Sequence, residues 1–335
     1  MVLSRLLQLA RSPTGRLIVA AGSGALLLAA AALAARRFTA TSWPLARGDP
    51  GLLAAVGCLS LMGYAFKAYG WRRLFAADER PQPLALAAAN GGASLTGLAL
   101  PGRFDDVVRV VVVRRYPGSR ACVRTLCLSL FMLGLIDSAA LAPLAAAAAL
   151  LGNESGLRAG LAVVAGAGVA AAMLVLALPH LVASRHLLRF RLGRWLSPRT
   201  TPLRAASEAW VLVSGGWITR AMGVFLLLGA LGIGFSFPLA LLFLCATSAA
   251  AALPFGPGGA ATQAGAGAAV LIAAGVGASQ AVEVAVASQA LGVLCGGSIL
   301  LSALIWRGAI QLLRRQAVAM ARLGISTPQA QGGEP

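Results

Sequence analysis

An all-α polytopic membrane protein is predicted by three features of the sequence. First, 59% of the 335 residues are hydrophobic and only 11% are charged, with a mean hydropathy of +0.82. Soluble domains have about 45–50% apolar and about 25% charged residues. Second, several apolar runs reach the roughly 20 residues that a spanning helix needs. Third, two shorter apolar segments are interrupted by Pro and Gly. This composition excludes a soluble enzyme, a disordered regulator and a secreted disulfide scaffold.

The N-terminal region predicts a short cytoplasmic segment followed by a first spanning helix. Residues 1–16 contain three arginines, and residues 17–35 form an apolar run of 19 residues. The apolar core of a signal peptide has about 7–15 residues. We therefore interpret residues 17–35 as an uncleaved membrane anchor.

Five further apolar runs have the length of full spans, which gives about six in total. They are residues 51–69, 125–151, 157–180, 209–231 and 284–306. The predicted transmembrane domain is thus 17–306, with halves of about 17–151 and 157–306. Residues 307–335 are expected to form a basic cytoplasmic tail.

The charge of the chain is strongly positive, with 28 Lys and Arg against 10 Asp and Glu. The arginines concentrate in residues 102–124, in residues 185–208 and after the last span, whereas residues 152–158 and 232–236 are almost neutral. Basic loops of membrane proteins stay in the cytoplasm. We therefore expect a bacterial cytoplasmic (inner) membrane protein with both termini inside. The expected partners are anionic lipid headgroups rather than nucleic acid.

Two interrupted segments, 84–100 and 237–277, must each begin and end on one side of the membrane to satisfy this topology. Each is broken at a Leu-Pro sequence, and the breaks contain Pro101, Gly102, Pro254, Pro257, Gly258 and Gly259. Broken helices at membrane depth need cover from protein or a water-filled cavity. Such segments in corresponding halves are typical of an inverted-repeat transporter. We predict that the two segments open to opposite faces; two ordinary proline kinks are the alternative.

Two charged residues of opposite sign lie deep in apolar runs. Asp137 is about 18 Å and Arg220 about 16 Å from the start of its run, at 1.5 Å per residue. Charge inside a membrane is rare and usually functional. We expect the two side chains to face one cavity, where they either pair or together bind a headgroup. A purely structural ion pair is the alternative.

A second set of candidates follows the first break. If the chain is helical after Pro101, its free N–H groups lie beside Arg103 and offer a phosphate site together with Arg109. Asp106 precedes Arg109 by three residues, so the two can pair on a helix. Ordinary cytoplasmic arginines are the alternative interpretation.

Other polar residues are given structural roles. Lys67, which is the only lysine, and Trp71 lie near the end of a span and are expected to anchor it at the interface. The five cysteines form no CxxC pair and there are two histidines, so neither a metal site nor a cofactor is predicted.

Three short motifs resemble those of a known family. They are Gly70-Trp71-Arg72-Arg73-Leu74, the segment from Leu100 to Arg109, and Leu253-Pro254-Phe255-Gly256-Pro257-Gly258-Gly259. In their order and spacing they are similar to the flippase-like family, which comprises the membrane portion of lysylphosphatidylglycerol synthases and stand-alone relatives. Compared with the family pattern, Asp105 replaces Gly and Gly134 replaces Arg. Ala261 and Ala264 stand where Gly and Glu are usual, with Gln263 as the nearest polar group.

The resemblance implies a protein that binds and translocates anionic or modified phospho- or glycolipids. The chain ends about 30 residues after its last span, so we expect no synthase domain and no enzymatic activity. A non-transporting partner subunit of an envelope lipid pathway, beside an envelope-biosynthesis enzyme, is the alternative. A membrane-embedded lipid-modifying enzyme is a weaker one, because the sequence has neither HExxH nor GxSxG.

Overall fold

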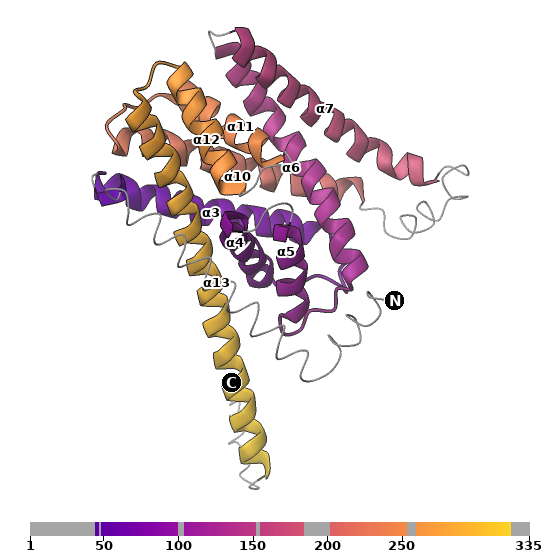
Figure 1. Ribbon diagram of the computed structural model, residues 1–335. Helices are drawn as coiled ribbons and strands as arrows, with labels where there is room; N and C mark the ends of the chain where they lie inside the picture. The colour runs from indigo at the N-terminus through magenta and orange to yellow at the C-terminus, as the bar shows by residue number, and fades with distance from the viewer. Residues whose placement is uncertain are drawn as a thin grey trace, which may run out of the picture.

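The computed structural model describes residues 44–46, 48–99, 104–151, 155–183, 202–252 and 259–322. All regular structure within these ranges is helical, and Figure 1 shows its arrangement. A 3-10 turn, Pro44–Ala46, precedes nine α-helices. They are α3 (Pro50–Arg73), α4 (Pro83–Ala99), α5 (Phe104–Arg115), α6 (Val123–Leu151), α7 (Ser155–Ala183), α10 (Leu203–Ala230), α11 (Phe237–Ala252), α12 (Gly259–Ala273) and α13 (Ala278–Arg322).

The predicted all-α polytopic membrane architecture is confirmed. Five helices in the described ranges are long and apolar enough to cross a membrane, namely α3, α6, α7, α10 and α13. They correspond to five of the six predicted spans. The sixth, residues 17–35, lies outside the described residues, as do residues 1–16.

The centre of the fold is the antiparallel pair α3 and α10. The backbone N–H of Asp49 donates to the carbonyl of Ala230 at 3.2 Å, which joins the start of α3 to the end of α10. Gly70, near the other end of α3, lies against Val213 of α10 so closely that a Cβ there would stand 2.9 Å from its Cγ2 atom. Small residues allow this approach, as in many membrane helix pairs.

Two helical hairpins enter from opposite ends of this pair. The α4/α5 hairpin follows the Arg73 end of α3, and the α11/α12 hairpin follows the Ala230 end of α10. Tyr116, just after α5, packs against Ala85 at the start of α4, so these arms are antiparallel. Gly267 of α12 likewise lies against Phe243 of α11. The two hairpins thus begin at opposite ends of the α3/α10 pair. That they open to opposite faces of the membrane, as in an inverted repeat, stays a prediction.

The hairpins differ from the expected segments in one respect. Residues 104–115 are not only part of a basic connection, because they form α5, the returning arm of the first hairpin. Helices α11 and α12 have 16 and 15 residues and are shorter than the five spans. Of the break residues, Gly259 begins α12; Pro101, Gly102, Pro254, Pro257 and Gly258 lie outside the described residues.

Arginines gather at one end of the bundle, which we call the basic end. There Arg73 of α3 pairs with Glu208 of α10 at 3.2 Å, and Tyr116 packs against Ala303 of α13. The described arginines near this end are Arg72, Arg73, Arg80, Arg114, Arg115, Arg120, Arg124, Arg204 and Arg307. The charge asymmetry of the sequence is therefore also an asymmetry in space.

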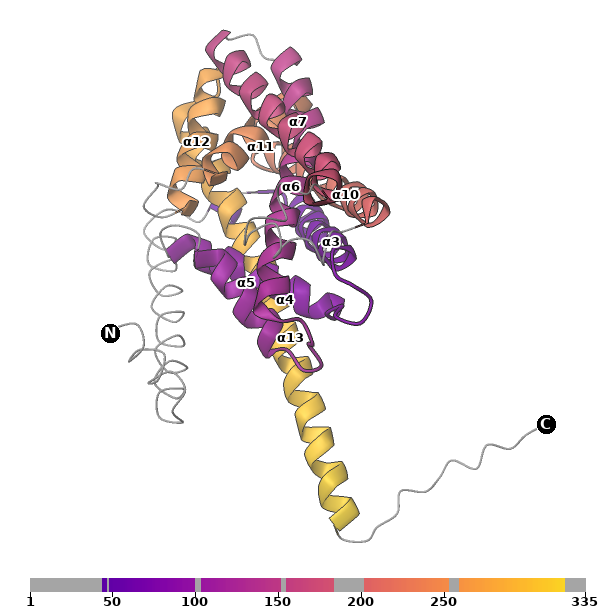
Figure 2. The same ribbon diagram turned by 90° about the vertical axis from the view of Figure 1, so that its right-hand side faces the viewer.

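Helix α13 continues past the predicted end of the last span at residue 306. It runs unbroken for 45 residues to Arg322, which corresponds to about 68 Å. Residues 307–322 of the predicted tail are thus helical and extend the span, and this part projects away from the other helices (Figures 1 and 2).

A close helix crossing joins α4 to α13. Gly91 lies on the carbonyl of Gly296, and a Cβ on Gly296 would stand 3.0 Å from the carbonyl oxygen of Gly91. Gly97, also on α4, has open space where a Cβ would be. The two glycines therefore provide a matched pair for testing this crossing.

We expect Gly91→Ala to destabilise the protein by about 1–3 kcal/mol, because the new methyl group overlaps backbone that cannot move alone. Gly97→Ala should be neutral or stabilising by about 0.5–1 kcal/mol, since alanine favours helices. Thermal unfolding of the detergent-purified variants measures both changes. Equal unfolding temperatures for the two variants would contradict the described crossing.

Candidate functional site

An ion pair between Lys67 and Asp137 joins α3 to α6. The Lys67 Nζ atom lies 2.9 Å from the Asp137 Oδ2 atom, and the side chains are only 22% and 25% exposed. Asp137 lies midway along α6. The interpretation of Lys67 as an interface anchor is wrong, since its ammonium group turns inward to a carboxylate.

Arg220 reaches the same region through Trp217. The Trp217 Nε1 atom donates to the backbone carbonyl of Asp137 at 3.2 Å, and the Arg220 guanidinium carbon lies 5.3 Å from the centre of the Trp217 ring. This is within the range of a cation–π contact. Direct pairing of Asp137 with Arg220, one of two predicted alternatives, is wrong because Lys67 holds the carboxylate. Joint binding of a headgroup stays a prediction.

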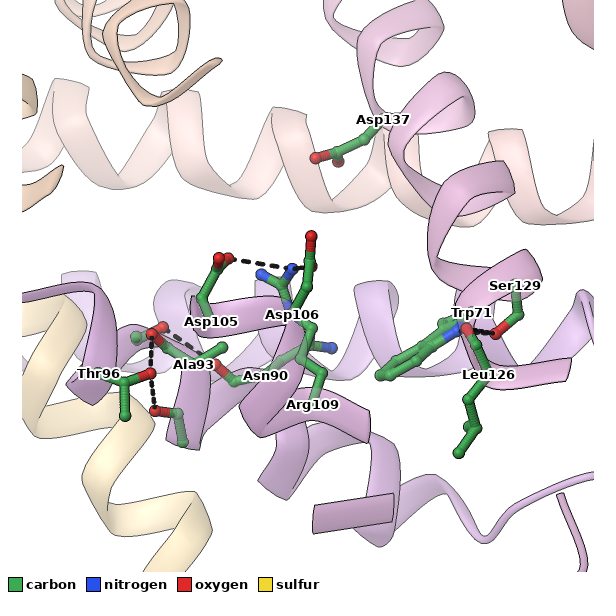
Figure 3. Close-up of polar contacts among 12 residues, drawn as sticks. Trp71, Asn90, Ala93, Thr96, Asp105, Asp106, Arg109, Leu126, Ser129 and Asp137 are labelled. Atoms are coloured by element: carbon green, nitrogen blue, oxygen red, sulfur yellow. Dashed lines mark hydrogen bonds and ion pairs between the residues drawn. The ribbon is translucent and has the colours of Figure 1, made fainter. Parts of the chain in front are cut away.

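On α5, Arg109 binds two carboxylates. Its Nη1 atom lies 3.2 Å from Asp105 Oδ2 and 2.5 Å from Asp106 Oδ1. The predicted pairing of Asp106 with Arg109 is confirmed, and Asp105 joins it. Both contacts use the same nitrogen, while the buried Nε of Arg109 has no hydrogen-bond partner. In Figure 3, Asp137 points from α6 toward the part of α5 that carries this group.

The charges of Asp137, Arg109 and Arg220 all act on the Lys67 ammonium group. Among the described residues, ion pairs join Lys67 to Asp137, and Arg109 to Asp105 and Asp106. We call the six residues Lys67, Asp105, Asp106, Arg109, Asp137 and Arg220 the charged cluster. It contains three cations and three carboxylates from four helices. Charges inside a membrane persist only when they are paired or face a polar cavity, and here most of them meet.

A polar network of uncharged groups borders the cluster. The hydroxyl of Tyr64 lies 2.6 Å from the Ser94 hydroxyl and donates to the Gly292 carbonyl at 3.2 Å. It thereby connects α3, α4 and α13. Tyr64 also lies within electrostatic reach of Arg220 and Arg109, so the network and the cluster are neighbours.

Trp71 has a different role from the one expected. Its side chain is fully buried, and its Nε1 atom donates to the Ser129 hydroxyl of α6 at 2.9 Å (Figure 3). The interface-anchor interpretation is therefore wrong for Trp71. It adds a second polar contact between α3 and α6, one turn beyond the ion pair of Lys67.

The predicted site residues divide into three groups. Asp106, Arg109, Asp137 and Arg220 belong to the charged cluster. Gln263 lies in the first turns of α12, and no hydrogen bond joins it to the cluster among the described residues. Arg103 lies outside the described residues. Within the same ranges, no three His, Cys, Asp or Glu side chains are grouped as metal ligands.

Four members of the site, Lys67, Asp105, Tyr64 and Trp217, are not predicted from the sequence. One signal was available for Lys67, because it is the only lysine among 28 basic residues. A second signal was the helical spacing of Tyr64, Lys67 and Trp71, which places three polar-tipped side chains along one side of α3.

The comparisons with known proteins give one family. The model of the lysylphosphatidylglycerol synthase TM region matches residues 14–297, well over half of the chain. The chain belongs to this family. The match spans α3 to α12, most of the membrane part of α13 and the entire charged cluster, and it confirms the predicted resemblance. Among curated proteins and solved structures, none matches the chain.

For this member of the lysylphosphatidylglycerol synthase TM region family, we expect Lys67→Met and Asp137→Asn each to cost about 1–3 kcal/mol, because each leaves a partly buried charge unpaired. The double variant should lose clearly less free energy of unfolding than the two single variants together, which makes the set a double-mutant cycle. Unfolding of the detergent-purified proteins measures the coupling.

The exposed pair Arg73–Glu208 is the matched control for this cycle. Its side chains are 47% and 36% exposed, so the coupling between Arg73→Met and Glu208→Gln should be at most about 1 kcal/mol. Additive effects in the Lys67–Asp137 cycle would show that the ion pair does not hold the helices together.

Proposed function

We propose that this chain binds phospholipids with anionic or modified headgroups and moves them across a bacterial cytoplasmic membrane. The proposal assigns binding and translocation to the charged cluster, with no covalent chemistry. The observation that carries it is Arg220, an exposed arginine of a membrane-spanning helix that no carboxylate contacts within the described ranges.

The chemistry of Arg220 suits a lipid phosphate. A guanidinium offers planar pairs of N–H donors that match phosphate oxygens. Trp217 supports one face of the group, which fixes its orientation at little cost in side-chain entropy. An unpaired charge at this depth is costly. A phosphate would therefore gain more binding free energy from contact with Arg220 than from contact with an arginine in water.

The cations also lie at successive depths from the basic end. Lys67 precedes Arg73 by six residues of α3, which is about 9 Å along the helix. Arg220 lies beside Gly63 of α3, ten residues or about 15 Å from Arg73. We propose that a headgroup passes from one of these cations to the next. This spacing supports movement rather than binding alone.

The two hairpins support access from both leaflets. Broken helices at the interface of inverted repeats are where many transporters bind substrate, and here the hairpins begin at opposite ends of the α3/α10 pair. We propose that the basic end is cytoplasmic, in keeping with the rule for basic loops. A lipid of the inner leaflet would then meet Arg73 first.

Reconstitution in liposomes tests the proposal. Vesicles containing fluorescent phosphatidylglycerol, and others with fluorescent phosphatidylethanolamine, are treated with a membrane-impermeant quencher to follow lipid movement. We expect the protein to accelerate movement of phosphatidylglycerol. Arg220→Gln should reduce the rate at least about tenfold, which corresponds to about 1.4 kcal/mol.

Arg158→Gln is the matched control, because Arg158 is an exposed arginine on α7 away from the cluster. Its rate should equal that of the unaltered protein. If the protein moves neither lipid faster than empty vesicles do, or if Arg220→Gln is as active as the control, translocation at this cluster is refuted. The first outcome would favour the non-transporting partner subunit, and the second would place translocation at other residues.

A further inference from the structure

Asn90 of α4 is a buried side chain without a hydrogen-bond partner. The residue is 3% exposed, and neither its carboxamide nitrogen nor its carboxamide oxygen has a partner. Unpaired buried amides destabilise a fold. A leucine of similar volume at this position of an apolar helix would avoid that cost, so packing alone does not account for asparagine here.

The position of Asn90 places it at the charged cluster. Ser94, one turn further along α4, donates to the backbone carbonyl of Asn90 at 3.1 Å and contacts the Tyr64 hydroxyl. Ala68 of α3 and Ala89 of α4, the neighbours of Lys67 and Asn90 in the sequence, belong to one buried core cluster. Together with the contact between Tyr64 and Ser94, this places Asn90 on the part of α4 that packs against α3.

A second unused donor lies on the neighbouring arm of the hairpin. The Nε atom of Arg109 is buried and has no partner. In Figure 3 the Asn90 side chain extends from α4 toward Arg109 of α5, and the close contact of Gly92 with Val108 shows that these helices pack together. Two packed helices thus carry two unpartnered buried donors, Asn90 Nδ2 and Arg109 Nε, and one unpartnered buried acceptor, Asn90 Oδ1.

We propose that Asn90 determines specificity by binding a hydroxyl group of the lipid headgroup. This rests on the proposed function, in which a cation of the cluster binds the phosphate of the same lipid. A hydroxyl donates to the carboxamide oxygen and accepts from one of the two donors. An ammonium group has donors only, so it would leave the Asn90 Nδ2 and Arg109 Nε donors without an acceptor. The substrate class is therefore a phospholipid whose headgroup carries hydroxyls, as glycerol and sugar headgroups do.

Lipid binding by the full-length, detergent-purified protein tests this assignment. The probes are phosphatidylglycerol, with headgroup hydroxyls, and phosphatidic acid, which carries the phosphate without them. Binding is measured from the rise in unfolding temperature with lipid concentration. We expect tighter binding of phosphatidylglycerol. Asn90→Leu should weaken binding of phosphatidylglycerol about tenfold and leave binding of phosphatidic acid unchanged. It should also raise the unfolding temperature of the lipid-free protein.

Thr96→Val is the matched control. Thr96 is also a buried polar residue of α4, but its hydroxyl donates to the backbone carbonyls of Gly92 and Ala93 (Figure 3). Its variant should keep the preference for phosphatidylglycerol. If Asn90→Leu fails to fold, Asn90→Ala takes its place, with the same loss of preference expected.

The outcomes separate this inference from the proposed function. Unchanged phosphatidylglycerol binding by the Asn90 variants would overturn the inference. It would indicate that Asn90 binds only a water molecule. Equal binding of the two lipids by the unaltered protein would also overturn it. Arg220→Gln could bind both lipids as the unaltered protein does, while Asn90→Leu no longer prefers phosphatidylglycerol. In that case the role of Arg220 in the proposed function fails and the hydroxyl site stands.

Discussion

The ion pair between Lys67 and Asp137 is the interaction on which the rest of the site depends. Asp137 is fixed three times, by Lys67 at its carboxylate, by Trp217 at its backbone carbonyl and by its own helix. These contacts connect α3, α6 and α10, and Trp217 in turn supports Arg220. Removal of either partner of the pair would leave a charge in an apolar environment. The position of Arg220 is therefore a consequence of how Asp137 is held.

The spans and the breaks could be predicted from local features of the sequence, whereas the partners of the charges could not. Apolar length identifies spans, and the position of Pro254 identifies a break, because both effects act within one segment. Lys67 lies near the end of its apolar run, so its depth alone suggested the interface. Its partner depends on how α3 crosses α6, and that crossing is set by contacts such as Trp71 with Ser129. No single segment contains this information.

The small and polar residues of α4, which are unusual for a membrane helix, are explained by its neighbours. Three of the residues that interrupt its apolar pattern serve different neighbours. Gly91 allows α13 to approach, Gly92 lies against α5, and Ser94 contacts Tyr64 of α3. The helix is therefore surrounded by protein on several sides, which explains how a segment of small and polar residues stays within a membrane. Asn90 has the same surroundings and lacks a partner among them.

The balance of charge in the cluster has an electrical consequence. Its three cations and three carboxylates sum to zero, so a rearrangement that moves them together transfers no net charge. A bound lipid phosphate changes this sum by about one unit. The membrane potential acts on such a unit with about 2.3 kcal/mol per 100 mV. Under the proposed function, voltage thus acts on the loaded protein and leaves the return of the empty one electrically silent.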